Sequence, residues 1–189
     1  MTKKRRSITT GVGDRGMTRL FSGEEVSKDS PRPEACGDVD ELVSALGIAR
    51  AQVRKADVRE AILYIQRSLF VVASELATSP QKHGLLKKHI DLSMVRELDR
   101  KRVALERQIA LPRGFIIPGE TVAAAHIDHA RAVARRCERK VVALAGGEIP
   151  DEHLLVWMNR LSDYLWLLAR REEGKPLLLS GRPRRKKSP

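Results

Sequence analysis

The sequence predicts an all-α protein, a five-helix antiparallel bundle preceded by an extended glycine-rich segment. Two observations predict the bundle: apolar residues recur at helical spacing over five successive stretches, and short polar, glycine- or proline-containing connections separate those stretches. A third observation, three glycines within residues 11–16, predicts the extended segment. At 189 residues the chain has the length of one domain and can bury a core without disulfide bonds.

Residues 9–36 contain glycine, proline and serine without a helical period, and within them residues 18–21 are expected to form a short strand or an extended anchor. The first helix is expected over residues 38–54, where Asp38 followed by Glu41 resembles a capping box. The second is expected from Asp57 to about Thr78, where Ser79 and Pro80 end it.

The third helix is expected over residues 92–108, with a charge-rich solvated face. Two prolines and two glycines in residues 111–119 break the pattern before a fourth helix over residues 121–145, which Gly146 and Gly147 would cap. The fifth helix is expected to begin at Pro150–Asp151 and to end near Arg171.

Basic residues are concentrated near the two ends of the chain. The formal net charge is +12, of which residues 3–6 supply +4 and residues 182–187 supply +5. We therefore expect disordered basic tails at residues 1–8 and 173–189 around a helical-bundle domain at residues 9–172. Aromatic residues make up 4% of the chain and none is interleaved with the basic runs, so no specific nucleic-acid partner is predicted.

The two cysteines, Cys36 and Cys137, lie far apart and have no close Cys or His at metal-ligand spacing. They therefore predict neither a disulfide framework nor a structural zinc site, and a reducing cytoplasm fits them best. No run of about 18 apolar residues and no secretory signal is visible, so a membrane association is not expected.

A first candidate binding motif is the glycine-rich stretch from Thr10 to Thr18, followed ten residues later by Lys28. Glycine permits the positive φ angles and close approach that let backbone N–H groups point at anionic oxygens. The stretch is therefore a candidate polyphosphate cradle, although by itself such a glycine-rich stretch is more often a plain turn.

A second motif lies in the fourth expected helix, where Arg131, Arg135 and Glu138 fall within about 60° of one face. Arg139 lies at the margin of this face, and Arg136 is turned away from it. Arginines four residues apart repel each other, which a bound anion would offset. The alternative is a solvated basic face with Glu138 as its internal counterion.

A third motif lies in the fifth expected helix, where Asn159 and Asp163 are four residues apart on a helix otherwise rich in Leu and Trp. Polar groups on such a helix are either satisfied structurally or used for binding.

Taken together, these motifs resemble the PduO-type ATP:cob(I)alamin adenosyltransferases. That family has the pattern T-(K/R)-x-G-D-x-G-x-T, then a lysine, D-E-L, F-(I/L)-x-P-G, A-R-x-x-x-R-R-x-E-R and N-R-L-S-D in this order. The likeness covers about residues 8–172. It implies a homotrimer of five-helix bundles that transfers the 5′-deoxyadenosyl group of ATP to cob(I)alamin or a related reduced corrinoid, with Mg²⁺ accompanying the ATP between neighbouring subunits.

The resemblance also implies roles for individual residues. Phe115 would face the lower axial side of the corrinoid, and Asp40 and Arg131 would form a salt bridge between subunits. Lys28 and Arg135 would be the catalytic residues, because the corrinoid is itself the nucleophile and the protein has to orient the reactants and stabilise the triphosphate. The implied ATP-binding residues are Thr10, Gly11, Val12, Gly13, Thr18, Arg19, Lys28, Arg135, Arg136, Glu138, Arg139 and Asn159. Further partners implied are a corrinoid reductase or an adenosylcobalamin-dependent mutase.

The chain departs from the family pattern at four positions. Gly11 stands where the family has Lys or Arg, Cys36 where a tyrosine is usual, Glu120 in place of the second glycine of P-G-G, and Asp128 in place of a histidine. Acidic groups near the start of the arginine-rich helix would weaken the binding of ATP. These departures leave open a second function, a weakly active or non-catalytic paralogue that binds ATP or corrinoid as a carrier or regulator.

Overall fold

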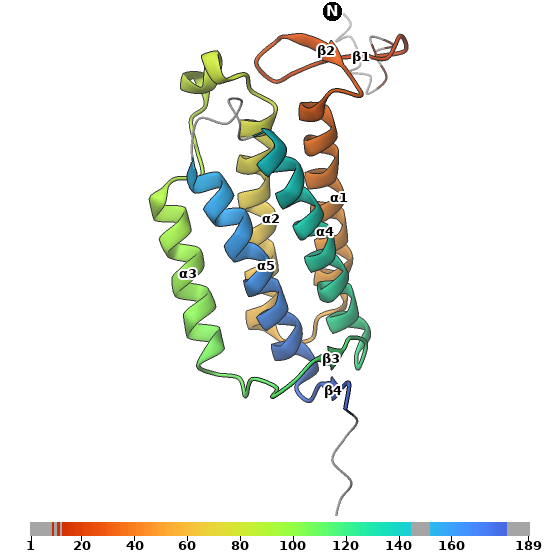
Figure 1. The fold of residues 1–189 in the computed structure, drawn as a ribbon, viewed down its shortest axis with the longest axis vertical. Coiled ribbons are helices and arrows are strands. Elements are labelled where there is room, and N and C mark those ends of the chain that lie inside the picture. Colours follow the sequence, from red (N-terminus) through yellow and green to blue (C-terminus); the bar gives the residue numbers. More distant parts are fainter. Residues whose placement is uncertain (1–8, 10, 12, 145–151, 181–189) are drawn as a thin grey trace, which may run out of the picture.

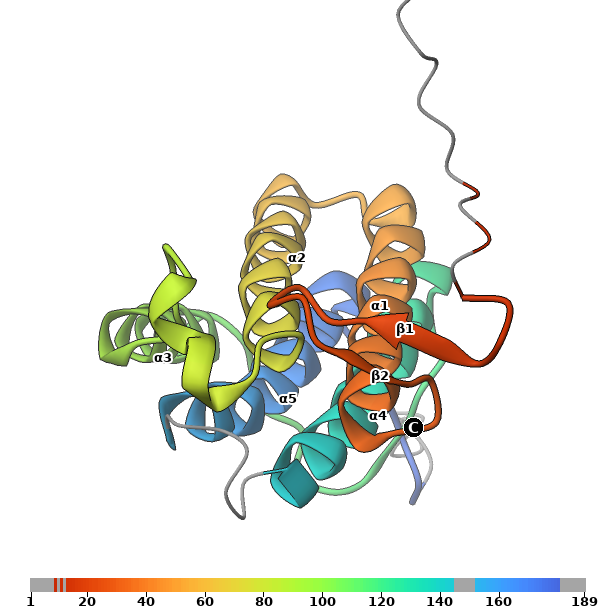
Figure 2. The ribbon, with the colours of Figure 1, turned by 90° about the horizontal axis from the view of Figure 1, so that it is seen from above.

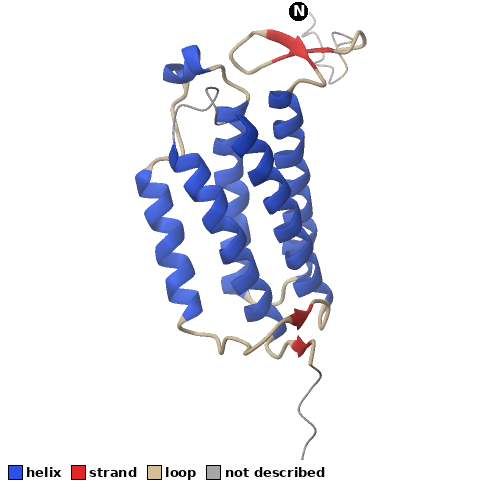
Figure 3. Ribbon diagram, in the orientation of Figure 1, coloured by secondary structure: helices blue, strands red, loops and turns tan. Residues whose placement is uncertain are grey.

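The computed structural model of the chain describes residues 9, 11, 13–144 and 152–180. Helices dominate this part of the molecule, and the few strands are very short (Figure 3). In chain order the elements are β1 (Met17–Arg19), β2 (Glu25–Ser27), α1 (Pro31–Gln52), α2 (Ala56–Leu76), the 3₁₀ helix η1 (Pro80–Leu85), α3 (Leu92–Glu106), β3 (Ile116–Ile117), α4 (Val122–Leu144), α5 (Glu152–Glu173) and β4 (Leu177–Leu178).

Consecutive α-helices run in opposite directions, so the predicted all-α antiparallel bundle is confirmed (Figure 1). The most extensive contacts join α1 to α4 and α4 to α5, while α2 packs on α1 and α3 packs on α5. Figure 2 shows the bundle from above, with α3 at its edge. The β1–β2 hairpin lies at one end of the bundle, and β3 with β4 lies at the other.

Helix α5 is the most completely buried of the helices because it contacts α4, α3 and α2. Trp157, Met158, Leu161 and Leu165 are fully excluded from solvent. Burial of each such side chain contributes about 1.5–3 kcal/mol, which explains why this helix is rich in Leu and Trp.

Helix α1 begins at Pro31, seven residues before the predicted start at Asp38, so the predicted boundary was wrong. Proline is tolerated in the first turn because its missing N–H would have no partner there, and its φ suits a helix. Asp38 and Glu41 are therefore not capping residues. Both lie inside α1 and form ion pairs with Arg136 of α4.

The chain stays ordered beyond residue 172, which corrects the predicted disordered tail over residues 173–180. After α5 ends at Glu173, Leu177 and Leu178 pair with Ile117 and Ile116 as an antiparallel ribbon. The apolar run in this segment explains the difference, because these leucines are half-buried whereas the basic run begins only at residue 182. The other predicted tail residues, 1–8 and 181–189, lie outside the described part of the chain, as do the expected glycine cap at 146–147 and helix start at 150–151.

The N-terminal hairpin is fastened to the end of α2. Within it Thr18 pairs with Val26, and beyond it Phe21 N–H donates to the carbonyl of Ala77 at 2.8 Å. Glu24 accepts hydrogen bonds from Ser22 and Ser79 and forms a 2.9 Å ion pair with Lys82 of η1. These hydrogen bonds, chiefly from Ser22 and Lys82, lower the pKa of Glu24 to about 2.

Within the described residues, no helix is both long enough and apolar enough to cross a bilayer.

Candidate functional site

The glycine-rich stretch folds into consecutive tight turns that lead into β1. Asp14 N–H donates to the carbonyl of Gly11 at 3.3 Å, and Gly16 N–H donates to the carbonyl of Gly13 at 3.2 Å. Gly11 and Gly16 have φ values of +69° and +79°, a region that L side chains rarely adopt. The positive φ angles expected of glycine are thus present at Gly11 and Gly16, while the binding of phosphate by this loop stays a prediction.

Lys28 lies directly against this loop. Its backbone N–H donates to the carbonyl of Gly16 at 2.9 Å, and its Nζ donates to the carbonyl of Gly13 at 2.7 Å. A Cβ atom at Gly13 would lie 2.8 Å from Nζ and 3.0 Å from Cε of Lys28. The absence of a side chain at Gly13 therefore lets the lysine ammonium reach the loop.

The other hairpin residues predicted for ATP lie close by. Thr18 is half-buried and Arg19 is exposed, both on β1. Thr10 and Val12 lie outside the described residues.

The arginine-rich part of α4 divides its charged side chains between two neighbouring helices. Arg136 faces α1, where Asp38 lies at 3.3 Å and Glu41 accepts a second hydrogen bond, and these carboxylates raise the pKa of the guanidinium. Glu138 faces α5, where it accepts a 3.0 Å hydrogen bond from Asn159. The helical arrangement predicted from the sequence, with Arg136 off the face of Glu138, is confirmed.

Arg135 and Arg139 are exposed on α4, and the guanidinium of Arg139 donates to the carbonyl of Arg135 at 2.9 Å. Across the described residues, no carboxylate lies within 4.0 Å of either guanidinium. Their charges are therefore available to an anionic ligand, unlike that of Arg136.

A cavity of about 440 Å³ lies between α3, α4, α5 and the connection that precedes β3. Arg131 and Asp163 line it together with Leu111, Pro112 and Trp166. The Nε of Arg131 is buried and has no hydrogen-bond partner in the described structure. Asp40 is exposed on α1, and in the described chain it forms no ion pair with Arg131. The predicted ATP-binding residues do not include Asp163, although the sequence showed it as a polar residue on the apolar fifth helix.

Phe115 directly precedes β3, which lies at the end of the bundle opposite the β1–β2 hairpin (Figure 1). Its side chain is 84% exposed, while its carbonyl accepts a 2.8 Å hydrogen bond from Leu179 N–H. The C-terminal ribbon thus holds the backbone of Phe115 and leaves the ring in solvent. One chain therefore does not bring Phe115 to the hairpin.

Of the four departures from the family pattern, Asp128 has the clearest structural explanation. Its carboxylate accepts hydrogen bonds from Arg170 at 2.5 and 3.4 Å, and Arg170 also pairs with Glu173. The side chains of Arg170 and Asp128 are only 2% and 10% exposed. Because Arg170 neutralises it, Asp128 does not act as an unpaired negative charge at the start of α4.

Both cysteines are free thiols that lie among packed side chains. Cys137 is buried, and its thiol donates to the carbonyl of Asp38 at 3.0 Å. Burial raises the pKa of Cys137 to about 12 and also raises the pKa of half-buried Cys36. Neither thiol is suited to nucleophilic chemistry near neutral pH.

The fold and the site together define a helical bundle with two separate basic surfaces, one formed by Lys28 over the glycine loop and one by the exposed arginines of α4. The sequence matches the family model described as cobalamin adenosyltransferase over residues 8–172. The chain belongs to this family, and several of its relatives are PduO-type corrinoid adenosyltransferases.

A corrinoid adenosyltransferase from Citrobacter freundii is 37% identical over 172 residues, which cover 89% of this chain and 96% of that protein. A cobalamin adenosyltransferase from Cupriavidus metallidurans is 41% identical over 166 residues, or 86% of each chain. Among solved structures, a variant PduO-type ATP:corrinoid adenosyltransferase from Lactobacillus reuteri, complexed with cobalamin and ATP, superposes with a TM-score of 0.84. It is 29% identical, and the match covers 91% of this chain and 98% of that one. The resemblance inferred from the sequence motifs is therefore confirmed.

Proposed function

We propose that this protein transfers the 5′-deoxyadenosyl group of ATP to cob(I)alamin or a related reduced corrinoid. In this reaction the electron pair of Co(I) forms a bond to C5′ of ATP, the bond from C5′ to the phosphate oxygen breaks, and triphosphate leaves with that electron pair. The homologous family and the complex of a relative with cobalamin and ATP support this assignment.

The observation on which the proposal depends most is the position of Lys28 over the glycine loop. Its ammonium donates to the carbonyl of Gly13, an interaction that a phosphate oxygen would replace with a charge-assisted hydrogen bond. Thr18 and Arg19 follow on β1, so their side chains lie next to the loop in the chain. Lys28 would thus stabilise the negative charge that develops on the leaving triphosphate.

The second contribution would come from Arg135 and Arg139 on α4, whose charges no described carboxylate neutralises. The hydrogen bond between Glu138 and Asn159 holds the two polar side chains together across α4 and α5, where they would orient the nucleotide. Arg136 is committed to α1, and its contribution to ATP binding would be indirect, through the position of α4.

We also propose that two subunits of a homotrimer share each nucleotide. In one chain the hairpin lies at one end of the bundle and Phe115 at the other, so a second copy is needed to bring an aromatic ring to the hairpin (Figure 1). The exposed ring of Phe115 supports this arrangement, since a corrinoid or a neighbouring subunit would cover it. Arg131 forms no ion pair within the described residues, which supports a salt bridge between its guanidinium and Asp40 of another copy.

Mg²⁺ is part of the proposal as a companion of the triphosphate. Asp14, beside Gly11, supplies a carboxylate in the described glycine loop, and no group of three potential metal ligands lies there among the described residues. This donor set fits Mg²⁺ held mainly by phosphate oxygens and water rather than by a protein cage. Bound in this way, Mg²⁺ would neutralise part of the phosphate charge.

The chemistry of the proposed reaction implies partner enzymes before and after it. A reduced corrinoid has to be supplied by an electron donor, which a corrinoid reductase in the cytoplasm would provide. An adenosylcobalamin-dependent mutase would consume the product.

The second candidate function is a carrier or regulator that binds ATP or corrinoid without transfer. One observation favours it: Gly11 occupies the position of a family lysine or arginine with a φ of +69°, so the loop has lost a cation there. Exposed Arg15 and Arg19 supply positive charge nearby.

The test mixes the purified protein with ATP, Mg²⁺ and chemically reduced cob(I)alamin and follows the corrinoid absorption spectrum. We expect the adenosylated product to form, and to form much more slowly with Arg135→Ala. Arg100→Ala is the matched control, because Arg100 is an equally exposed arginine on α3 with a local ion pair to Glu97. ATP binding without product would favour the carrier, and a monomer in light scattering would contradict the shared site.

A further inference from the structure

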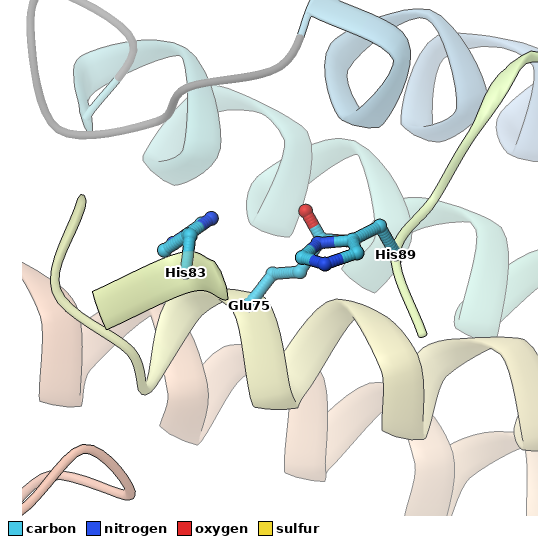
Figure 4. A group of neighbouring side chains, drawn as sticks. All are labelled: Glu75, His83 and His89. Carbon is cyan, nitrogen blue, oxygen red and sulfur yellow. The ribbon is translucent and has the colours of Figure 1, made fainter. Parts of the chain in front are cut away.

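A cluster of three potential metal ligands lies where α2 meets the connection to α3 (Figure 4). Glu75 is in the last turn of α2, His83 is in η1, and His89 lies just before the Asp91 cap of α3. One ligand atom from each residue lies within 4.8 Å of the others. We propose that Glu75, His83 and His89 bind a divalent transition-metal ion of the Zn²⁺ class.

The state of His83 supports this site independently of the clustering. His83 is only 7% exposed, and its Nε2 lies 3.0 Å from the carbonyl oxygen of Thr78. A carbonyl oxygen only accepts hydrogen bonds, so Nε2 must donate and Nδ1 keeps its lone pair. Nδ1 is buried and has no hydrogen-bond partner in the described structure.

This arrangement is the one that metal-binding histidines require. A ligating imidazole is usually held by a hydrogen bond from its other nitrogen to a carbonyl or carboxylate, which fixes the tautomer and the ring orientation.

Glu75 and His89 complete the donor set. Glu75 is 1% exposed, and its Oε1 accepts a hydrogen bond from Ile90 N–H, so its carboxylate is held beside the segment that contains His89. His89 is half-buried, which leaves a path from solvent to the cluster. The centroids of the two imidazole rings are 6.2 Å apart.

The chemistry of the donors selects the class of ion. Two imidazole nitrogens and one carboxylate oxygen suit Zn²⁺, whereas Mg²⁺ prefers oxygen ligands alone. Bond lengths of about 2.0–2.2 Å place two ligand atoms of a tetrahedral Zn²⁺ site about 3.4 Å apart, so small rotations of the side chains would close the set. A water molecule would occupy the fourth position.

The sequence predicted no structural zinc site because the two cysteines have no ligand near them in the chain. The proposed cluster does not involve either cysteine. The structure brings the ligands together from residues up to fourteen positions apart.

Bound metal would fasten the connection over residues 77–91 to the end of α2. The same connection holds the N-terminal hairpin, through the Phe21–Ala77 hydrogen bond and the ion pair between Lys82 and Glu24. The site would therefore stabilise the end of the bundle that bears the glycine loop, without touching the reacting atoms.

The experiment uses the full-length chain without a histidine tag, treated with chelator and then freed of it. Zn²⁺ is titrated by calorimetry, and Co²⁺ by its visible absorption, in the presence of excess Mg²⁺. We expect one Zn²⁺ per chain, a Co²⁺ spectrum typical of nitrogen and oxygen ligands, and a higher melting temperature with Zn²⁺. His89→Gln should weaken Zn²⁺ binding at least tenfold and abolish the rise in melting temperature.

His129→Gln is the matched control, because His129 is exposed on α4 and belongs to no described ligand cluster, and it should bind Zn²⁺ as the unmodified protein does. Glu75→Gln provides a second test that keeps the side-chain shape. Equal Zn²⁺ affinity in the unmodified protein and in folded His89→Gln would overturn the proposal, as would no binding to the unmodified protein. These measurements use neither nucleotide nor corrinoid, so their failure is distinguishable from a failure of the proposed transferase function.

Discussion

Replacing Lys28 with Met removes the ammonium from the glycine loop and keeps most of the side-chain volume. In the proposed complex the ammonium forms a hydrogen bond to a phosphate, which contributes about 1.5–3 kcal/mol when one partner is charged. Binding also breaks the existing 2.7 Å hydrogen bond from Nζ to the carbonyl of Gly13. At an exposed site that bond is worth about 0.5 kcal/mol, which leaves about 1–2.5 kcal/mol, or a Kd for ATP raised about 5- to 60-fold.

The measurement is isothermal titration of ATP with Mg²⁺ at fixed ionic strength, because salt screens exposed charges. Lys87→Met is the control for net charge, since Lys87 is exposed on the connection between η1 and α3. The melting temperature should stay the same in both variants because neither side chain is buried.

Gly13→Ala tests the position of the Lys28 ammonium without removing its charge. The added Cβ would lie 2.8 Å from Nζ of Lys28, so the flexible lysine has to move while the backbone stays unstrained. We expect a smaller loss of ATP affinity than in Lys28→Met. If Lys28→Met binds ATP as tightly as the unmodified protein, the reasoning about the loop is refuted.

Three further predictions concern the bundle. Asp128→Ala leaves the buried Arg170 with one carboxylate fewer and should lower the free energy of unfolding by about 3 kcal/mol in urea denaturation. It should not tighten ATP binding, and a tighter complex would show that Asp128 repels the nucleotide. Cys137 has a pKa near 12 because it is buried, so a thiol reagent at pH 8 should label it only after unfolding, as mass spectrometry can show. Glu24 has a lowered pKa, so its stabilising contribution is present above pH 4.5 and is lost as the pH falls toward 2. The difference in melting temperature between the unmodified protein and Glu24→Gln should shrink over that range, and a difference that is undiminished at pH 2 would contradict the assignment.

The helices were predictable because their signal is local. Apolar spacing in five stretches located every α-helix, and the ends of α2 and α3 fall within about two residues of the prediction. The start of α1 was missed because its first residues were assigned to the segment 9–36 without a helical period, although proline suits a first helical turn. The ribbon of β3 and β4 was missed because two-residue strands have no period to recognise.

The site was predictable in part. Helical geometry separates Arg136 from the face of Glu138, and the structure pairs them with α1 and α5 respectively. The sequence could not show which charges are already neutralised inside the chain. Asp128 is an example, since its partner Arg170 lies 42 positions away.

By itself, the sequence determined the helical class, the family and the residue types available for phosphate, because periodicity and ordered motifs are properties of neighbouring residues. Only the tertiary structure decided which of those residues remain free for a ligand. It directed Arg136 to α1, placed the Lys28 ammonium on the loop and brought Glu75 to two histidines. The physical reason is that burial and pairing depend on how separate helices pack, and contacts between distant residues have no fixed spacing along the chain.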